Sequence, residues 1–450
     1  MKVESKRIVL CKGIRTPIGH LSKSLAGFLP EELMRIAIES LIKQTALDHH
    51  LIDGVMVGWV GQGSHAPNIA RVTALQAKLP IQIHAFTVQA NCVSGIESIC
   101  SAARHILLGE GGLYLAGGTE SMSNFPYVFR GSRKLKELRS LDTLVANWST
   151  VLENKEIALT DCIEEGLTDP VEHLNMAATA EVCAQIYGAT RPEEDEYAYE
   201  SYKRALEGEE DGFYSSHIAP LVKNGETILE KDEYPYLRES LVKKKEMIAK
   251  APLFFDSPAM SIKDFYKTYG KFIFGKEYRE GESKATVTLF NSCARSDGAA
   301  VFIVTTDEIA RKNNLEIMAE IKNWSFYGVN PAVMGIGPVY ATLAALKKAE
   351  LKFEDLDYIE VHEAFAATNV SIFKLAKSKY NQDWEKLWRE RRLNHYGGSI
   401  ALGHPLAATG TRIILNLVEM MKRDPSARYG LATACASGGL GGAIILEKYK

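Results

Sequence analysis

The sequence predicts an α/β fold built from two similar halves, with a different kind of segment inserted between them. Three observations support this prediction. Short apolar runs alternate with amphipathic helical stretches near both ends of the chain, a pattern typical of βαβ units. The two alternating regions are of similar size, and the stretch between them, about 124–282, is richer in charged residues and tyrosine. We therefore expect a duplicated fold with a mainly parallel sheet that helices cover on both faces.

Each element expected in the first half follows from its own residues. The apolar run 7–11 ends near glycine and proline, which predicts a buried strand followed by a turn. Residues 30–47 have two glutamates near their start and continue with an apolar stripe, which predicts a helix. The elements that follow alternate in the same way. They are strands at 55–60, 86–89 and 112–117, and helices at 68–79 and 94–108.

The last third of the chain repeats this alternation. We expect strands at 299–305, 356–361, 430–434 and 442–447, and helices at 340–350 and 410–421. In the middle segment, helices are predicted at 173–187 and, after the start signal TRPE, at 193–207. The predicted domains are residues 1–123, the first part of the N-terminal half; 124–282, a loop domain with an extra insertion near 239–282; and 283–450, whose first residues complete the N-terminal half.

Composition excludes several classes of protein. The chain has 450 residues, of which 46% are hydrophobic and 24% charged, as in ordinary soluble globular proteins. Its 53 basic and 56 acidic residues leave a net charge of -3, which argues against a nucleic-acid-binding protein. No apolar run reaches the length of a membrane span, and the first residues do not resemble a signal or transit peptide. We expect a cytoplasmic protein whose seven cysteines form no disulfide framework and no zinc site.

Four motifs carry residues that could perform chemistry. Cys92 in NCVSG stands just before a predicted helix, whose N-terminus favours a thiolate, although a buried structural thiol has the same signature. His404 in GGSIALGHP is framed by glycine and proline in a tight loop. His362 in HEAFA follows a predicted strand, where ligands bind in α/β sheets, and Ala366 rules out the zinc motif HExxH. Cys435 precedes the glycine-rich turn ASGGLGG, whose N–H groups are free to bind an oxyanion. Together they form a nucleophile with an acid–base set.

These motifs make the chain resemble the thiolase family along nearly its whole length. RTP at 15–17, GGTESM at 117–122, MAATAE at 176–181, NSC at 291–293 and MGIGP at 334–338 occur in the family's order. HEAFA and HPLAATG resemble the 3-ketoacyl-CoA thiolase subunits of trifunctional fatty-acid-oxidation complexes. The resemblance implies a thiolase fold, in which two βαβαβαββ halves form five α-β-α-β-α layers. It also implies cleavage of 3-ketoacyl-CoA by CoA, with no permanently bound cofactor and with coenzyme A as co-substrate.

The resemblance also assigns roles to residues. Cys92 is the expected nucleophile, and His404 takes its proton and hydrogen-bonds the thioester oxyanion. Cys435 is expected to protonate the acetyl-CoA enolate and to deprotonate the incoming CoA. His362 stands where many thiolases have asparagine and helps to stabilise the enolate oxygen, while the N–H groups of Cys92 and Ser437 form a second oxyanion hole. The residues expected to contact CoA or substrate are Asn175, Met176, Arg238, Cys293 and Met334.

Some features depart from the family or leave alternatives open. Cys293 replaces a frequent serine that binds the pantetheine arm, and a thiol is a weaker hydrogen-bond partner than a hydroxyl. Residues 239–283 contain an apparent insertion of about twenty residues, either inert or able to reshape the acyl tunnel or a docking surface. The basic stretch 129–148 could touch a membrane or a partner subunit.

Alternative functions are also open. They are a biosynthetic acetoacetyl-CoA thiolase, a decarboxylating ketoacyl synthase, which Cys435 argues against, and a non-catalytic acyl-CoA or sterol carrier. By resemblance we expect a homodimer or homotetramer. A complex with a hydratase/dehydrogenase subunit is a further possibility that the resemblance raises.

Overall fold

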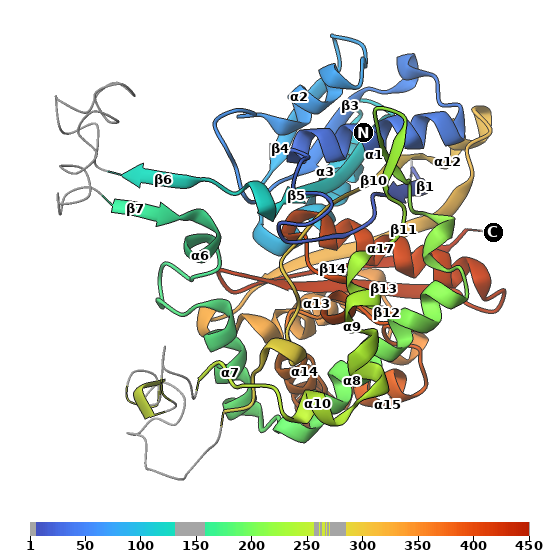
Figure 1. Cartoon of the computed structure of the whole chain (residues 1–450). Helices are drawn as coiled ribbons and strands as arrows, with labels where there is room; N and C mark the ends of the chain where they lie inside the picture. The colour runs from blue at the N-terminus through green and yellow to red at the C-terminus, as the bar shows by residue number, and fades with distance from the viewer. Residues whose placement is uncertain are drawn as a thin grey trace, which may run out of the picture.

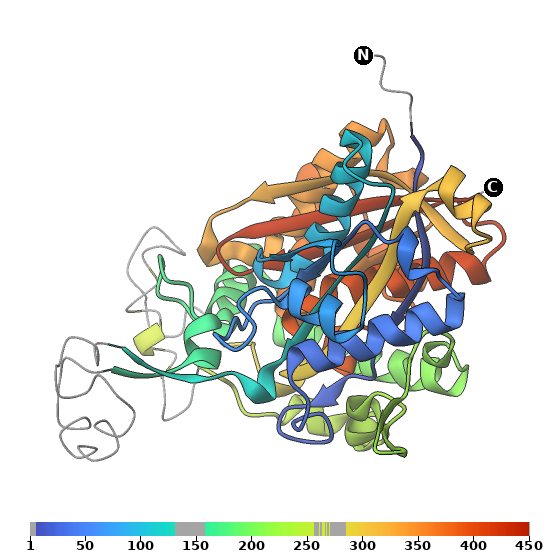
Figure 2. The ribbon, with the colours of Figure 1, turned by 90° about the horizontal axis from the view of Figure 1, so that it is seen from above.

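The computed structural model describes residues 6–130, 158–255 and 285–449, together with residues 261, 263–265, 267 and 270. Most of the basic stretch 129–148 lies outside these residues. So does the larger part of the predicted insertion after residue 255. Figure 1 shows the N-terminal half above the C-terminal half, with β6 and β7 projecting to one side, and Figure 2 shows the same projection from above.

The N-terminal half alternates strands and helices as the apolar pattern predicted. Its helix α3 has the predicted bounds. Its last strand, β10, comes from a segment far along the chain and lies between β1 and β5. The elements of this half are β1 (Ile8–Arg15), β2 (Gly19–His20), α1 (Pro30–Thr45), β3 (Gly54–Gly58), α2 (Ile69–Gln76), β4 (His84–Val88), α3 (Ser94–Leu108), β5 (Leu113–Ser121) and β10 (Ser296–Thr306).

The C-terminal half follows the same order of strands and helices. An isolated parallel bridge between Ile359 and Leu393 takes the place of the third strand. Helix α17 is longer than the predicted 410–421, and two long elements, β11 and α14, were not predicted. The elements are α12 (Asp307–Lys312), β11 (Ile317–Gly328), α13 (Gly337–Ala349), β12 (Tyr358–Val361), α14 (Ala366–Tyr380), α15 (Trp384–Arg389), α16 (Ser399–Leu402), α17 (Leu406–Arg423), β13 (Tyr429–Ala436) and β14 (Leu440–Lys448).

The segment between the halves is mostly helical and is anchored to the N-terminal half by a buried ion pair. Arg15 of β1 makes two hydrogen bonds of 2.7 Å to Asp232, directly before α9. The described elements are β6 (Tyr127–Arg130), β7 (Ala158–Asp161), α6 (Cys162–Gly166), α7 (Met176–Tyr187), α8 (Arg191–Glu210), β8 (Leu221–Lys223), β9 (Glu226–Leu229), α9 (Glu233–Lys243) and α10 (Glu246–Ala249).

The sheet is mixed, so the prediction of a mainly parallel sheet is wrong. In the described part of the chain ten strands form one sheet in the order β12-β13-β14-β11-β1-β10-β5-β3-β4, with β2 paired to β10, and β6–β7 and β8–β9 form two separate two-stranded sheets. Among the described strands, only β3 with β4 and β5, and β12 with β13, pair in parallel. The difference arises because β13 and β14 form a hairpin, which must be antiparallel. In addition, β10 enters antiparallel to both β1 and β5 after the inserted segment.

Alternate side chains of each strand pack against helices on opposite faces of the sheet. The helices therefore form three layers, which enclose the N-terminal and C-terminal parts of the sheet. In β10, Val301 and Ile303 pack into the core that contains α1 and α2, whereas Phe302 and Val304 face the core around α3 and α17. In β14, Ile444 faces that same central core and Ile445 faces α13 and α14. The layers are therefore α-β-α-β-α, as the fold prediction required, with α3 and α17 buried at the centre.

None of the helices in the described ranges has the length and apolar character needed to cross a membrane.

Candidate active site

A cavity of about 840 Å³ opens where the ends of the central helices meet the inserted segment. Every residue that the sequence analysis assigned to catalysis, to an oxyanion hole or to CoA and substrate binding lines this cavity. They are Cys92, Asn175, Met176, Arg238, Cys293, Met334, His362, His404, Cys435 and Ser437. Residues from both halves and from the inserted segment therefore meet in one site.

Cys92 lies in a single helical turn, Asn91–Val93, that leads directly into α3. Asn91 adopts a left-handed backbone with φ of 51°, which asparagine tolerates better than most residues. Its side chain donates a hydrogen bond of 2.9 Å to the carbonyl of Ser437. This bond ties the turn that carries Cys92 to the glycine-rich turn after β13.

His404 lies just before α17, the same position in the second half that Cys92 has before α3 in the first. Its backbone N–H donates to the carbonyl of Ala294 at 2.8 Å, and Gly403 precedes it with φ of 97°. A Cβ atom on Gly403 would lie 2.2 Å from Ser296 Oγ, so this loop requires glycine. The loop brings His404 Nε2 to 3.3 Å from Cys92 Sγ.

The partner of the other ring nitrogen indicates the tautomer of His404. Nδ1 lies 2.6 Å from Thr409 Oγ1, and this hydroxyl lies 3.2 Å from the carbonyl of Pro405, the residue directly before α17. If Thr409 donates to Pro405, it accepts from Nδ1–H, and the lone pair of Nε2 then faces the Cys92 thiol. Thr409 was not among the site residues predicted from the sequence, although it stands five residues after His404 within the HPLAATG motif.

Two glycines allow α3 and α17 to approach closely enough to join Cys92 and His404. A Cβ atom on Gly95 of α3 would lie 2.6 Å from the carbonyl of Ala407 and 2.7 Å from the backbone nitrogen of Thr411. A Cβ atom on Gly410 of α17 would lie 2.7 Å from the backbone nitrogen of Ile96. The two backbones touch at the ends that carry the two functional side chains, and larger residues would separate them.

The electrostatics of the Cys92–His404 pair correct one expectation. Burial raises the pKa of the Cys92 thiol to about 12, although the N–H groups of Ser437 and of Cys92 itself lower it. Burial and the charge of Arg412 lower the pKa of His404 to about 3. The expected stabilisation of a thiolate at the helix end is therefore outweighed by burial. A neutral thiol faces a neutral imidazole, which acts as a base when the sulfur attacks.

His362 and Glu363 stand at the end of β12, where the two residues have different tasks. The His362 ring lines the cavity and lies 4.2 Å from the His404 ring. Glu363 points away from the cavity and accepts hydrogen bonds from Ser201, Tyr197, Asn394 and the backbone of Ile400, at 2.6–3.2 Å. Glu363 thus joins α8 and the loop before α16 to β12, a positioning role that the sequence analysis did not assign.

Cys435 is the penultimate residue of β13 and faces the cavity at the start of the glycine-rich turn. Burial raises the pKa of its thiol well above the usual value, as do the nearby Cys92, Cys183 and Cys293. Gly438 and Gly439 adopt φ of 81° and 73°, which turns the chain back into β14 and leaves the Ser437 N–H beside the Cys92 sulfur. The backbone N–H groups of Cys92 and Ser437 therefore both lie close to the Cys92 sulfur.

The remaining predicted contacts lie along the walls of the cavity. Arg238 hydrogen-bonds the hydroxyl of Tyr202 and lies over the rings of Tyr202 and Tyr234. The Asn175 side chain caps α7 by accepting from Ala178 N–H at 2.8 Å. Burial raises the pKa of Cys293 to about 12. The apolar part of the wall includes four residues from the described part of the predicted insertion, Pro252, Leu253, Phe254 and Phe255.

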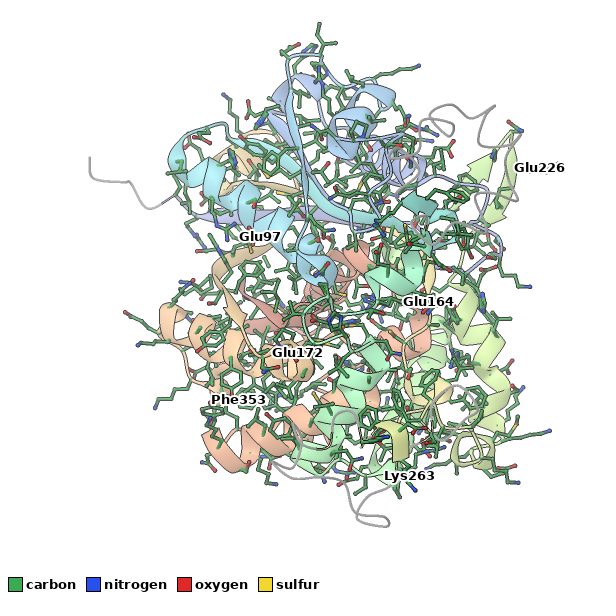
Figure 3. All side chains as sticks on the ribbon, turned by 90° about the vertical axis from the view of Figure 1, so that its left-hand side faces the viewer. Glu97, Glu164, Glu172, Glu226, Lys263 and Phe353 are labelled. Atoms are coloured by element: carbon green, nitrogen blue, oxygen red, sulfur yellow. The ribbon has the colours of Figure 1, made fainter. Side chains whose placement is uncertain are left out.

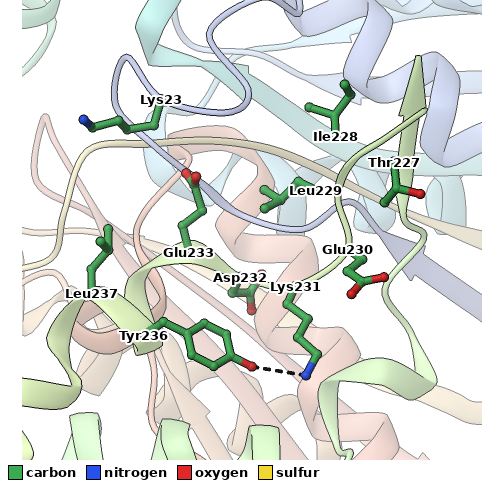
Figure 4. Close-up of a pocket in the computed structure, with 10 residues that line it drawn as sticks. All are labelled: Lys23, Thr227, Ile228, Leu229, Glu230, Lys231, Asp232, Glu233, Tyr236 and Leu237. Atoms are coloured by element: carbon green, nitrogen blue, oxygen red, sulfur yellow. Dashed lines mark hydrogen bonds between the residues drawn. The ribbon is translucent and has the colours of Figure 1, made fainter. Parts of the chain in front are cut away.

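The rim of the cavity carries charge. Glu164 of α6, which Figure 3 shows between the two halves, is largely exposed and forms an ion pair of 2.7 Å with Arg295. A second hollow lies by the β8–β9 hairpin and the start of α9, where Lys231 Nζ is 3.2 Å from the hydroxyl of Tyr236 (Figure 4). The hollow by the β8–β9 hairpin contains none of the predicted site residues.

In the described ranges, no three His, Cys, Asp or Glu side chains are grouped so that they could hold a metal ion.

Comparisons with known proteins cover nearly the whole chain. A family model described as the N-terminal domain of thiolase matches residues 8–254, and one described as the C-terminal domain of thiolase matches residues 315–448. A probable acetyl-CoA acetyltransferase of Escherichia coli (strain K12) is 33% identical over 98% of this chain and 99% of that protein. A probable acetyl-CoA acyltransferase of Staphylococcus aureus (strain COL) is 32% identical over 99% of this chain and 100% of that protein.

Solved structures also match nearly the whole chain. Human mitochondrial 3-ketoacyl-CoA thiolase has a TM-score of 0.81 at 30% identity and 99% coverage of both chains. A structure of the same human enzyme in complex with CoA has a TM-score of 0.81 at 29% identity, with 99% of this chain and 98% of that chain covered.

Proposed function

Because the chain belongs to the thiolase family, we propose that it is a 3-ketoacyl-CoA thiolase of fatty-acid β-oxidation. It cleaves 3-ketoacyl-CoA with CoA to acetyl-CoA and an acyl-CoA shortened by two carbons, through a thioester on Cys92. Its α/β fold matches solved thiolases along the whole chain. The observation that carries the proposal is the distance of 3.3 Å between Cys92 Sγ and His404 Nε2, in a cavity that Cys435 and His362 also line.

The first half of the reaction forms the acyl-enzyme. His404 Nε2 takes the Cys92 proton as the sulfur attacks the 3-keto carbon, and the N–H groups of Cys92 and Ser437 hold the resulting oxyanion. The bond between C2 and C3 then breaks, and the acetyl-CoA enolate leaves. His362 and the newly protonated His404 donate to the enolate oxygen, while the Cys435 thiol protonates its carbon.

The second half releases the shortened product. The Cys435 thiolate takes the proton of the incoming CoA thiol, whose sulfur attacks the thioester on Cys92. The N–H groups of Cys92 and Ser437 again hold the oxyanion. The Cys92 sulfur leaves as thiol when His404 returns its proton. CoA is therefore a co-substrate, bound along the wall that contains Asn175, Met176, Arg238, Cys293 and Met334.

A Cys92→Ser variant tests the nucleophile. We expect the variant to lose thiolysis of 3-ketoacyl-CoA while it stays folded and still binds CoA, because serine preserves the shape and lacks a nucleophilic thiol. Thiolysis is followed by the absorbance of the 3-ketoacyl-CoA enolate, and CoA binding by calorimetry. Turnover equal to wild type contradicts the mechanism.

A Cys435→Ala variant tests the division of labour between the two thiols. Complete thiolysis should stop because no group remains to protonate the enolate carbon or to deprotonate CoA. Cys92 should still accept an acyl group from acyl-CoA, since its base and oxyanion hole remain. Intact-mass measurement detects this adduct, and its absence at every acyl-CoA concentration contradicts the assignment.

An acetoacetyl-CoA thiolase working in the biosynthetic direction is the second candidate. The names of relatives favour it, because the E. coli protein and a solved Bacillus anthracis structure are both described as acetyl-CoA acetyltransferases. The degradative assignment is supported by His362, because the HEAFA motif that contains it resembles the 3-ketoacyl-CoA thiolase subunits of trifunctional fatty-acid-oxidation complexes. Thiolysis rates across 3-ketoacyl-CoA chain lengths separate the two, since the biosynthetic enzyme acts only on the shortest. A non-catalytic acyl-CoA or sterol carrier predicts no turnover at any length.

We also propose where and in what assembly the enzyme works. The cytoplasm keeps the two functional thiols reduced, and all seven cysteines are free. We expect a homodimer or homotetramer, and a complex with a hydratase/dehydrogenase subunit, because both are suggested by the resemblance to the thiolase family. Light scattering of the purified protein, alone and mixed with such a subunit, measures both.

A further inference from the structure

One ring nitrogen of His362 has a hydrogen-bond partner, and the other has none among the described residues. Nδ1 lies 2.9 Å from Ser399 Oγ. Nε2 is buried and has no hydrogen-bond partner among the described residues, and the ring lines the cavity beside His404. A neutral imidazole carries a single proton, so the partner of Nδ1 decides whether Nε2 donates or accepts a hydrogen bond.

Arg412 determines the direction of the Ser399 hydroxyl. Arg412 Nη2 donates to Ser399 Oγ at 2.7 Å, and His362, Ser399 and Arg412 are all at most 1% exposed. A guanidinium has no acceptor atom, so the hydroxyl proton of Ser399 cannot point back at Arg412. Within the described part of the chain, the other hydrogen-bond partner of this hydroxyl is His362 Nδ1. Ser399 therefore donates to Nδ1, and the proton of the imidazole lies on Nε2.

We propose that Arg412 and Ser399 are positioning residues that hold His362 as the Nε2–H tautomer, a donor aimed at the oxygen of the leaving enolate. The inference deepens the proposed thiolase reaction and rests on it for the identity of that oxygen. It gives the two neighbouring rings complementary hydrogen-bonding roles. His404 Nε2 accepts a proton from Cys92, and His362 Nε2 donates to substrate.

The charge of Arg412 supports the same arrangement. Burial, His404 and Arg412 together lower the pKa of His362 well below its usual value, so the ring stays neutral and has a defined tautomer. A neutral donor fixed before substrate arrives needs no reorganisation when the enolate forms, which is the condition under which such donors stabilise a transition state most.

The tautomer is measured by ¹⁵N NMR of protein labelled with [¹⁵N]histidine, and a His362→Gln variant identifies the signal. In the wild-type protein we expect the proton on Nε2. Ser399→Ala should shift it towards Nδ1, and Ser399→Thr, which keeps the hydroxyl, should restore it. A wild-type proton on Nδ1 overturns the proposal, and this measurement does not depend on turnover or on whether either Ser399 variant folds.

Kinetics test the consequence. Ser399→Ala should lower kcat for cleavage of 3-ketoacyl-CoA by about 100-fold with little change in KM, because one oxyanion donor is lost. Transfer of an acyl group from acyl-CoA to Cys92 should keep its rate, because that step uses the other oxyanion hole. Ser371→Ala is the matched control, since this buried serine on α14 donates to Ala367 at 2.7 Å, is not a cavity residue, and should leave both rates unchanged.

Two kinetic outcomes contradict the proposal. One is wild-type kcat in Ser399→Ala, and the other is an equal loss in both steps, which indicates general damage to the site. If the wild-type protein cleaves no 3-ketoacyl-CoA but carries the Nε2–H tautomer, the proposed function is wrong and the positioning by Arg412 and Ser399 stands.

Discussion

At the scale of single residues, Thr409 illustrates how a hydroxyl can determine what a histidine does. Thr409 Oγ1 contacts His404 Nδ1 at 2.6 Å and the carbonyl of Pro405 at 3.2 Å. Ser399 occupies the matching position for His362 but has Arg412 as its second partner. One hydroxyl has an acceptor as its second partner and the other a donor, so the two rings receive opposite tautomers.

A Thr409→Val variant tests whether the Thr409 hydroxyl determines the tautomer of His404. The change keeps the shape of the side chain and removes the hydroxyl, so Nδ1–H loses its acceptor and the Nε2 lone pair is no longer held towards Cys92. We expect acylation of Cys92 to slow by about 100-fold, the lower range for a lost general base. Rapid-quench intact mass measures the rate, and Thr409→Ser, which keeps the hydroxyl, should remain near wild type. Equal rates in the valine and serine variants contradict the assignment.

At the scale of elements, the crossing of α3 and α17 determines whether Cys92 and His404 meet. Both side chains stand directly before their helices, and the two backbones touch at Gly95 and Gly410. The contact involves main-chain atoms of Ala407 and Thr411, which cannot move aside as a flexible side chain can. Helix packing is thus coupled directly to the distance between nucleophile and base.

A Gly95→Ala variant should therefore damage stability and catalysis together. We expect unfolding free energy to fall by about 1–3 kcal/mol, the usual cost of overpacking, and Cys92 acylation to fall because the helices separate. Gly27→Ala is the control, since among the described residues, its two chain neighbours aside, no atom lies within 4 Å of a Cβ atom there. Chemical denaturation and the acylation assay measure the two effects. A stable, fully active Gly95→Ala protein rules out the coupling.

At the scale of the whole molecule, burial shifts the pKa of ionisable groups, so a buried side chain can have a different charge from an exposed one at the same pH. Glu360 of β12 is 3% exposed, and burial raises its pKa to about 8, while Arg412 opposes the shift. Below this value the folded protein keeps Glu360 protonated, whereas the unfolded chain ionises it above its ordinary pKa of 4.5. Between these values the folded state binds one more proton, so unfolding free energy falls as pH rises.

A Glu360→Gln variant isolates this contribution. Glutamine does not titrate, so the stability of wild type relative to the variant should fall by about 2.7 kcal/mol between about pH 5.5 and about pH 7.5. Urea unfolding of both proteins at the two pH values provides the measurement. A difference that does not change with pH means that Arg412 keeps Glu360 ionised throughout.

Elements with a clear local pattern could be predicted from the sequence, and elements without one could not. Helix α3 has the predicted bounds because its apolar stripe is regular. Helix α14 was missed because its buried stretch 366–373 mixes apolar residues with Thr368, Asn369 and Ser371, so the sequence shows no separate apolar stripe and polar face. The mixed pairing of the sheet also escaped prediction, because strand direction depends on how the chain returns after the inserted segment.

The sequence by itself determined the motifs, most of the elements and ten of the residues that line the cavity, since these depend on side-chain chemistry and short-range backbone preference. Only the tertiary structure decided that Cys92 and His404, 312 positions apart, lie 3.3 Å from each other. It also decided that burial keeps both neutral and that two hydroxyls set the tautomers of two histidines. The physical reason is that desolvation and hydrogen-bond direction are properties of the assembled interior, where residues distant in sequence surround each group.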